Sequence, residues 1–138
     1  MTPKHFFDTN ILLYSISTDP KELDKRRRAI ELLELDGGAI SIQVVQEFYV
    51  QATRPSKSGA ATHSEALKLI TGWTRFPIQE MTMTIFTSAL EIKKRFEFSY
   101  WDSAVIAAAR ELGCKTLYSE DMSHGQRVSG VLIVNPFL

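Results

Sequence analysis

Short apolar runs alternate with longer amphipathic segments along this chain, and that alternation limits the possible folds more than any other feature. The short runs have the length of strands and end in turn residues; they cover residues 4–7, 37–42, 76–81, 115–119 and 131–134. The longer segments carry helical periodicity or helix-start residues; they cover 9–16, 19–35, 43–54, 63–73, 82–96 and 100–113. The segment 120–130 is predicted to be a polar turn. This order predicts an α/β fold with a mainly parallel central sheet flanked by helices.

The size of the chain suits one domain with a hydrophobic core. It has 138 residues, of which 44% are hydrophobic, so we expect a single domain over residues 1–138. No apolar run is long enough to span a bilayer, and the start "MTPKHFFDTN" lacks the apolar region of a secretory signal. The only cysteine, Cys114, cannot form an internal disulfide. We therefore expect a cytoplasmic protein without membrane contact, with Cys114 packed in the core.

Acidic residues recur where a parallel sheet would bring them together. In open α/β sheets the carboxyl ends of strands and the amino ends of helices share one edge, where ligands bind. Asp8 follows the first apolar run, and Glu47 lies about one turn into the helix after the second. Asp102 opens an otherwise apolar helix, and Glu120 and Asp121 follow the run that ends at residue 119. The sequence thus predicts an acidic cleft at the carboxyl-terminal edge of the strands.

Each acid also has a structural explanation. Asp8 could cap the short helix that follows it, and Asp102 could form a capping box with Ser99. Glu47 could be an exposed helical residue, and Asp121 could belong to a turn. For any single acid this explanation is at least as good as a functional one. Caps and turns do not explain why four acids fall on one predicted edge.

A cleft of four carboxylates needs a cation, because like charges repel one another. Oxygen ligands favour Mg²⁺ or Mn²⁺, and the three histidines show no ligand spacing with each other or with Cys114, which argues against zinc. Such ions lower the pKa of water and neutralise phosphate charge, which suits hydrolysis of a phosphodiester. The sequence therefore predicts metal-dependent hydrolysis without a nucleophilic triad.

Four segments, "FFDTNILLY", "QVVQEFYVQATR", "YWDSAVIAAARELGC" and "TLYSEDM", together resemble the PIN-domain family of nucleases. Within that family they resemble the VapC-type toxins of toxin–antitoxin pairs. The resemblance spans essentially the whole chain, and the motifs fall in family order. It implies a PIN-like domain in which Asp8, Glu47, Asp102 and Asp121 hold Mg²⁺ or Mn²⁺ and support hydrolysis of RNA.

The resemblance also implies supporting residues and partners. Ser119 occupies a position that is usually Thr or Ser beside the metal, and Asn10 resembles a polar residue that braces the site. Glu120 is an additional acid, interpreted either as support from outside the metal site or as a solvent-exposed side chain. The resemblance further implies a homodimer that a cognate antitoxin holds inactive.

The charge balance of the chain is unusual for an RNA-binding protein, because such proteins carry a basic excess. Here 16 basic residues balance 16 acidic ones. Neutralisation of four acids by metal would leave 12 acidic residues against 16 basic ones. The candidate phosphate contacts, each of which could equally be a solvated surface charge, are Lys25–Arg28, Arg54, Lys57, Lys93–Arg95, His124 and Arg127.

Two non-catalytic alternatives remain open. A receiver-type signalling domain also groups acids around Mg²⁺, but it would have paired acids near its start, a phosphoacceptor Asp in mid-chain and a Lys after a late strand. Here Asp8 stands alone, residues 48–79 contain no Asp, and Lys115 precedes its strand. A PIN-like scaffold could instead bind RNA or protein without cutting, although the complete set of four acids argues against it.

Overall fold

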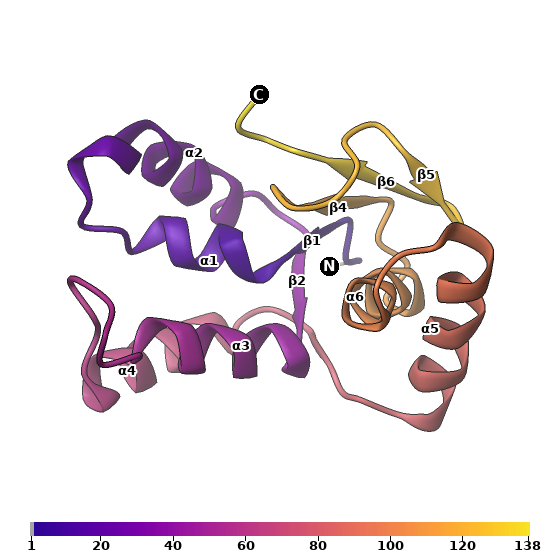
Figure 1. Ribbon diagram of the computed structural model, residues 1–138, viewed down its shortest axis with the longest axis horizontal. Coiled ribbons are helices and arrows are strands. Elements are labelled where there is room, and N and C mark those ends of the chain that lie inside the picture. Colours follow the sequence, from indigo (N-terminus) through magenta and orange to yellow (C-terminus); the bar gives the residue numbers. More distant parts are fainter. Residues whose placement is uncertain (1) are drawn as a thin grey trace.

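The computed structural model describes residues 2–138, which form a six-stranded sheet flanked by helices (Figure 1). The strands are β1 (His5–Phe7), β2 (Gly38–Ser41), β3 (Ile78–Gln79), β4 (Thr116–Tyr118), β5 (Arg127–Val128) and β6 (Val131–Val134). The helices are α1 (Thr9–Ser15), α2 (Leu23–Leu33), α3 (Ile42–Ala52), α4 (His63–Trp73), α5 (Met83–Phe96) and α6 (Tyr100–Glu111), with a short 3-10 helix, η1 (Pro20–Glu22), before α2. The predicted α/β architecture is confirmed.

The strands run in the order β3-β2-β1-β4-β6-β5. All neighbouring strands pair in parallel except β5 and β6, which are antiparallel. The prediction of a mainly parallel sheet is therefore confirmed. The prediction of a polar turn over 120–130 is wrong for the last part of this segment, which contains the strand β5. Ser129 and Gly130 have φ of 51° and 85°, the positive values that a two-residue hairpin turn requires, and they join β5 to β6. β5 has only two residues, too few for an alternating pattern to be visible.

The core lies on both faces of the central strands. Phe6, Phe7 and Leu117 are fully buried, which is typical of parallel strands covered by helices on each side. In Figure 1, α1 and α3 lie on one side of β1 and β2, and α6 with α5 lies on the other. The apolar run of α6 is buried because this helix packs against both α5 and the sheet.

Two expectations from composition concern the core and the membrane. Cys114 is buried, as predicted, and its burial raises the pKa of the thiol to about 11. Among residues 2–138, no helix is long and apolar enough to cross a membrane.

The topology places four chain segments at one edge of the sheet. β1 leads into α1 through Asp8, β2 leads into α3, and β4 leads into the loop 119–121. The amino end of α6 comes to the same edge. These are the segments that carry the predicted acids.

Candidate functional site

Asp8, Glu47, Asp102 and Asp121 line one cavity of about 120 Å³. Asp8 joins β1 to α1, Glu47 lies in the second turn of α3, and Asp102 lies in the first turn of α6. Asp121 follows β4 by three residues. Acids that are far apart in the sequence are therefore neighbours in the structure, and their role as metal ligands stays a prediction.

Asp8 is the most buried of the four acids. Its Oδ1 accepts a hydrogen bond from the Thr9 backbone N–H (2.8 Å), so it does cap α1, and its Oδ2 accepts one from the Ser119 hydroxyl (2.7 Å). Burial raises the pKa of Asp8 to about 6; the two hydrogen bonds lower it, and the charges of Glu47 and Asp102 raise it further. The capping explanation is therefore correct for Asp8, and the same carboxylate also borders the cavity.

Glu47 is held by two side chains rather than pointing freely into solvent. Its Oε2 accepts a hydrogen bond from the Thr9 hydroxyl (2.7 Å), and its Oε1 accepts one from Gln43 Nε2 (3.0 Å). Gln43 Nε2 also donates to the carbonyl of Trp101 (3.2 Å), which ties α3 to the start of α6. Gln43 and Thr9 are not among the site residues predicted from the sequence. The four-residue spacing between Gln43 and Glu47 on one helix was the available signal.

Asp102 takes part in only half of the expected capping box. The Ser99 hydroxyl accepts from the Asp102 backbone N–H (3.1 Å), but the hydrogen bonds of residues 2–138 include none from the Ser99 N–H to the Asp102 carboxylate. That carboxylate is therefore free to border the cavity. Partial burial is the main cause that raises the pKa of Asp102, and the negative charge of Asp121 is the next. The hydrogen bond with Ser99 lowers this pKa, and the charge of Glu47 raises it further.

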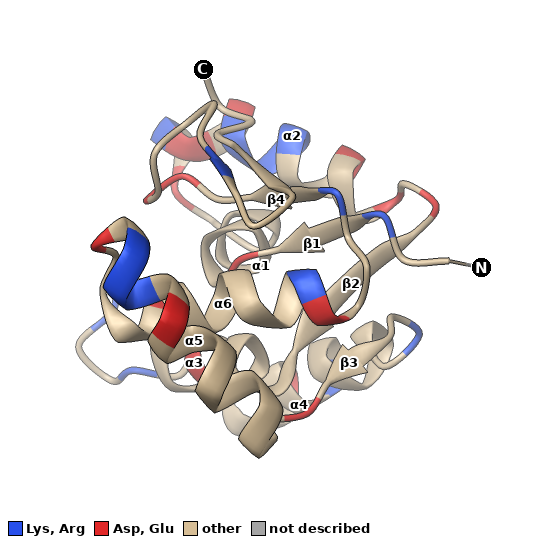
Figure 2. Ribbon diagram, turned by 90° about the vertical axis from the view of Figure 1, so that its right-hand side faces the viewer, with Lys and Arg blue, Asp and Glu red and all other residues tan. Residues whose placement is uncertain are grey.

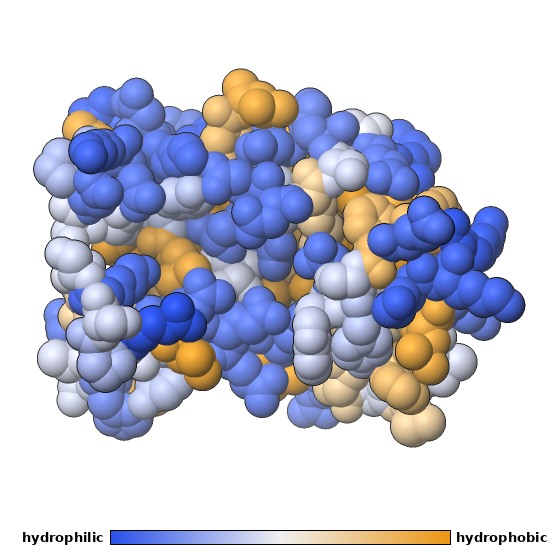
Figure 3. All heavy atoms as spheres, viewed as in Figure 1, coloured by the Kyte–Doolittle hydropathy of each residue, from blue (hydrophilic) through white to orange (hydrophobic). Residues whose placement is uncertain are grey.

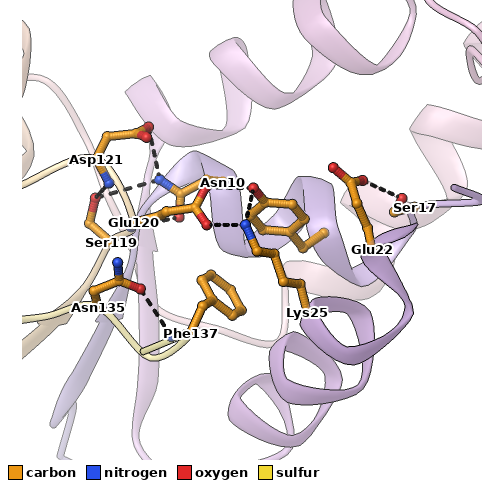
Figure 4. A network of polar contacts seen from close by, with 10 residues as sticks. Asn10, Ser17, Glu22, Lys25, Ser119, Glu120, Asp121, Asn135 and Phe137 are labelled. Carbon is orange, nitrogen blue, oxygen red and sulfur yellow. Dashed lines mark hydrogen bonds and ion pairs between the residues drawn. The ribbon is translucent and has the colours of Figure 1, made fainter. Parts of the chain in front are cut away.

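The loop after β4 is fixed by the side chain of Asn10 (Figure 4). Asn10 Nδ2 donates to Asp121 Oδ2 (3.1 Å) and lies 3.5 Å from Ser119 Oγ, while its Oδ1 accepts from the Glu120 N–H (3.2 Å). Ser119 Oγ also accepts from the Asp121 N–H (3.3 Å). One side chain of α1 thus contacts all three residues of the loop, and the bracing role of Asn10 at a metal site stays a prediction.

Glu120 points away from the acidic cavity toward α1 and α2 (Figure 4). Lys25 Nζ lies 2.5 Å from its Oε2, and the Tyr14 hydroxyl donates to its Oε1 (2.5 Å). Lys25 Nζ also lies over the rings of Tyr14 and Phe137, 4.9 and 5.8 Å from their centroids. Burial favours the protonated acid, but the hydrogen bonds from Lys25 and Tyr14 and the Lys25 charge lower the pKa of Glu120. The hydrogen bonds that Lys25 itself donates to Glu120 and to the Tyr14 hydroxyl raise the pKa of Lys25 to about 12.

These contacts change two earlier interpretations. Glu120 is not a simple solvent-exposed acid, because two side chains hold its carboxylate. Lys25 is not a free phosphate contact, because its ammonium pairs with that carboxylate. The two residues together connect α2 to the loop that carries Asp121.

The other candidate phosphate contacts differ in the groups that surround them. Lys57 lines a larger cavity of about 720 Å³, which shares Asn10 and Asp121 with the acidic one. Arg27 and Arg28 pair with acids of their own helix at 3.9 and 3.5 Å. Of these residues, Lys57 borders a cavity next to the acidic site.

The remaining basic candidates lie in other parts of the structure. Lys93–Arg95 form the last turn of α5 (Figure 2), and Arg54 and Arg127 are exposed. His124 Nδ1 accepts a hydrogen bond from the Asn135 N–H (2.9 Å), which gives this side chain a structural partner.

The residues that line the acidic cavity include no Lys, Arg, His or Cys. Four carboxylates therefore share this space without a protein cation, and the raised pKa values of Asp8 and Asp102 reflect their burial and mutual repulsion. As placed, no group of three or more His, Cys, Asp or Glu side chains within residues 2–138 is arranged to hold a metal ion. Oxygens of Asp8, Glu47 and Asp121 are instead held by protein donors. The carboxylate atoms that could bind a metal ion in this cavity are all oxygens, which suit Mg²⁺ or Mn²⁺ and not zinc.

Comparison with known proteins agrees with the fold. The family model of the PIN domain matches residues 5–126. A toxin–antitoxin complex from Klebsiella pneumoniae superposes with a TM-score of 0.72 at 20% identity, over 96% of this chain and 98% of that one. VapBC2 from Rickettsia felis, bound to a DNA fragment from its promoter, gives 0.65 at 18% identity over 94% and 96%. The sarcin–ricin-loop-cleaving toxin VapC20 from Mycobacterium tuberculosis gives 0.64 at 18% identity over 83% and 87%. No curated protein matches the sequence.

Proposed function

Because the chain belongs to the PIN domain family, we propose that it is a divalent-metal-dependent endoribonuclease, comprising one PIN domain over residues 1–138. One observation carries this proposal: four carboxylates from four separate segments line one cavity that no Lys or Arg lines. The similarity of the fold to VapC20, described as a sarcin–ricin-loop-cleaving toxin, supports RNA as the substrate.

Asp8, Glu47, Asp102 and Asp121 would hold Mg²⁺ or Mn²⁺. Such an ion supplies positive charge that polarises a phosphodiester and offsets the charge of its phosphate. Ser119 and the Thr9 N–H orient the two oxygens of Asp8. Among residues 2–138, no Lys or Arg lines the cavity, so a bound ion would also allow a phosphate to approach the four carboxylates.

The residues around the acids have positioning roles in this proposal. The Thr9 hydroxyl and Gln43 orient Glu47, and Asn10 orients Asp121. Glu120 joins the loop 119–121 to Lys25 on α2 and therefore supports the site without contacting the cavity. Hydrogen-bond partners of this kind orient the side chains that bind a metal ion.

We further propose that the protein is the toxin of a toxin–antitoxin pair, acts in the cytoplasm and forms a homodimer. The support is the similarity in fold to toxin–antitoxin complexes. The exposed side chains of Met83 and Leu90 lie two turns apart on α5, which suits contact with a protein partner. In Figure 3, hydrophobic residues are exposed in the lower part of the α5 side, below a group of hydrophilic residues. Light scattering after size exclusion measures the dimer, and a small reading frame beside the gene would favour an antitoxin.

The direct test is cleavage of RNA by purified protein with chelator, Mg²⁺, Mn²⁺ or Zn²⁺. We expect no cleavage in chelator, recovery with Mg²⁺ or Mn²⁺, and loss of activity in Glu47→Gln and Asp102→Asn. Glu111→Gln is the matched control, because it removes a carboxylate from the opposite, exposed end of α6. Full activity in chelator would refute the metal mechanism, and active Glu47 and Asp102 variants would refute the site.

A second candidate, a PIN-fold scaffold that binds RNA or protein without cutting, is favoured by one observation. The carboxylates as placed are not arranged around an ion site. This alternative predicts that RNA binds in Mg²⁺ and stays intact, and that the carboxylate variants bind RNA as well as the wild type does.

A further inference from the structure

A third cavity, of about 470 Å³, opens beside the acidic one. Met81, Phe86, Tyr100 and Trp101 contribute to its walls, and Gln43 and Trp101 line both cavities. Trp101 therefore borders both an aromatic space and the cavity of the four carboxylates. It is 63% exposed, although a tryptophan is among the side chains that gain most from burial.

The aromatic cavity has the chemistry of a stacking site. The ring of Trp101 meets that of Tyr100 edge-on, with centroids 5.0 Å apart and an interplanar angle of 77°, and Phe86 lies 5.9 Å from Tyr100. The residues that line this cavity include no charged side chain. The neighbouring amino-terminal half of α5 is also without charge (Figure 2). The cavity therefore suits a flat, uncharged group that has an aromatic face.

We propose that Trp101 and this aromatic cavity bind an unpaired RNA base next to the phosphate that enters the acidic cavity. This inference rests on the proposed ribonuclease function and adds a substrate requirement to it. Proteins that bind single-stranded nucleic acid stack bases on exposed aromatic rings, which paired bases in a duplex cannot reach. The enzyme should therefore prefer single-stranded regions and loops whose bases can turn outward.

The backbone explains why a base and a phosphate would be fixed together. Trp101 and Asp102 are consecutive residues at the start of α6, so the stacking ring and the carboxylate have a short, rigid connection. Gln43 holds the carbonyl of Trp101 and also orients Glu47. A base on Trp101 and its neighbouring phosphate among the acids would thus be located by one hydrogen-bonded unit.

A second copy of the chain fits this cavity less well than RNA does. Trp101 forms part of the wall of the acidic cavity, so a protein seated on it would narrow the space through which a phosphate must pass. Met83 and Leu90, which are 74% and 44% exposed on α5, are outside the residues that line the aromatic cavity and remain available to a protein partner.

Tryptophan fluorescence can test the proposal directly. The chain has two tryptophans, and Trp73 is buried against Phe48, so Trp73→Phe leaves Trp101 as the sole tryptophan. In Mg²⁺, a mixed-sequence single-stranded RNA should quench Trp101 emission in stopped flow before product forms. The same strand annealed to its complement should quench it much less.

Kinetics on the otherwise wild-type chain provide the second measurement. Trp101→Ala should raise KM roughly 5- to 150-fold with a smaller effect on kcat, the range that corresponds to about 1–3 kcal/mol for one stacked base. Trp101→Phe should retain most of the affinity, which also controls for folding. Leu67→Ala, at a 52% exposed apolar residue on α4, should leave KM unchanged.

The possible failures are distinguishable. If RNA is cleaved but neither Trp101 emission nor KM in Trp101→Ala responds, the stacking proposal is wrong and the ribonuclease proposal stands. If neither Trp101 emission nor cleavage responds to any RNA, both proposals are wrong. If the emission depends on protein concentration instead of RNA, and Trp101→Ala changes the oligomeric state, the surface is a contact between copies and the stacking proposal is refuted.

Discussion

Replacement of Asp8 by Asn should stabilise the metal-free protein at neutral pH. The structure raises the pKa of this acid from 3.8 to about 6, mainly through burial. At pH values between 3.8 and about 6, Asp8 therefore keeps its proton in the folded state and has lost it in the unfolded state. The free energy of unfolding falls as pH rises through this window. At ~1.4 kcal/mol for each pH unit of the window, the ionised carboxylate destabilises the fold by about 3 kcal/mol above pH 7.

Urea denaturation in chelator, repeated from pH 4 to pH 8, measures this effect. Asp8→Asn should exceed the wild type in unfolding free energy by about 1–3 kcal/mol at pH 7.5, and the difference should disappear near pH 4. Asp36→Asn is the matched control, because it removes the same charge from an exposed position before β2.

Magnesium should reverse the order of stability. A ligand that binds only the folded state adds RT ln(1 + [L]/Kd), about 2.7 kcal/mol at 100 times Kd, and the variant should gain little of it. If Asp8→Asn is less stable than the wild type in chelator at pH 7.5, and the two pH profiles are parallel, the assignment of Asp8 to a repulsive, cation-binding cluster is wrong.

Three further predictions concern other parts of the molecule. Lys25→Met should lower the unfolding free energy, measured in urea, by only about 0.5–1 kcal/mol, because the ion pair with Glu120 is partly exposed. A larger loss would mean that this ion pair stabilises more of the structure than the loop after β4. Native Cys114, with a pKa of about 11, should react with iodoacetamide at pH 8 far more slowly than in urea, and equal rates would contradict its burial. Gly38→Ala should cost about 1–3 kcal/mol of stability in thermal unfolding, because its new Cβ would lie 2.7 Å from Phe7 Cε2; wild-type stability would show that the aromatic core yields there.

The fold and the meeting of the acids could be predicted from the sequence because both depend on regular patterns. Alternating strands and helices determine a parallel sheet, and a parallel sheet brings Asp8, Glu47, Asp102 and Asp121 to one edge whatever the details of packing. The match of the PIN model to residues 5–126 confirms the family.

The contacts that organise the site could not be predicted in the same way. Lys25 belongs to a run of four basic residues that is typical of a solvated helix face. Its partner Glu120 is 95 residues away in the sequence, so no local pattern indicates the pair. Gln43 donates both to its own helix and to the carbonyl of Trp101, a bond that no local pattern indicates. The antiparallel strand β5 was missed because two residues carry no periodicity.

The hydrogen bond between Ser119 and Asp8 joins residues that are 111 positions apart in the sequence. The hydrogen bond between Asn10 and Asp121 spans the same number of positions. During synthesis the amino-terminal segment leaves the ribosome first, at about 5–20 residues per second, so Asp8 is made many seconds before its partners. The central strand β1 likewise lacks its neighbour β4 until residue 118 has emerged. A nascent chain therefore has no assembled acidic cavity, and the candidate site is incomplete while the ribosome is still synthesising the protein.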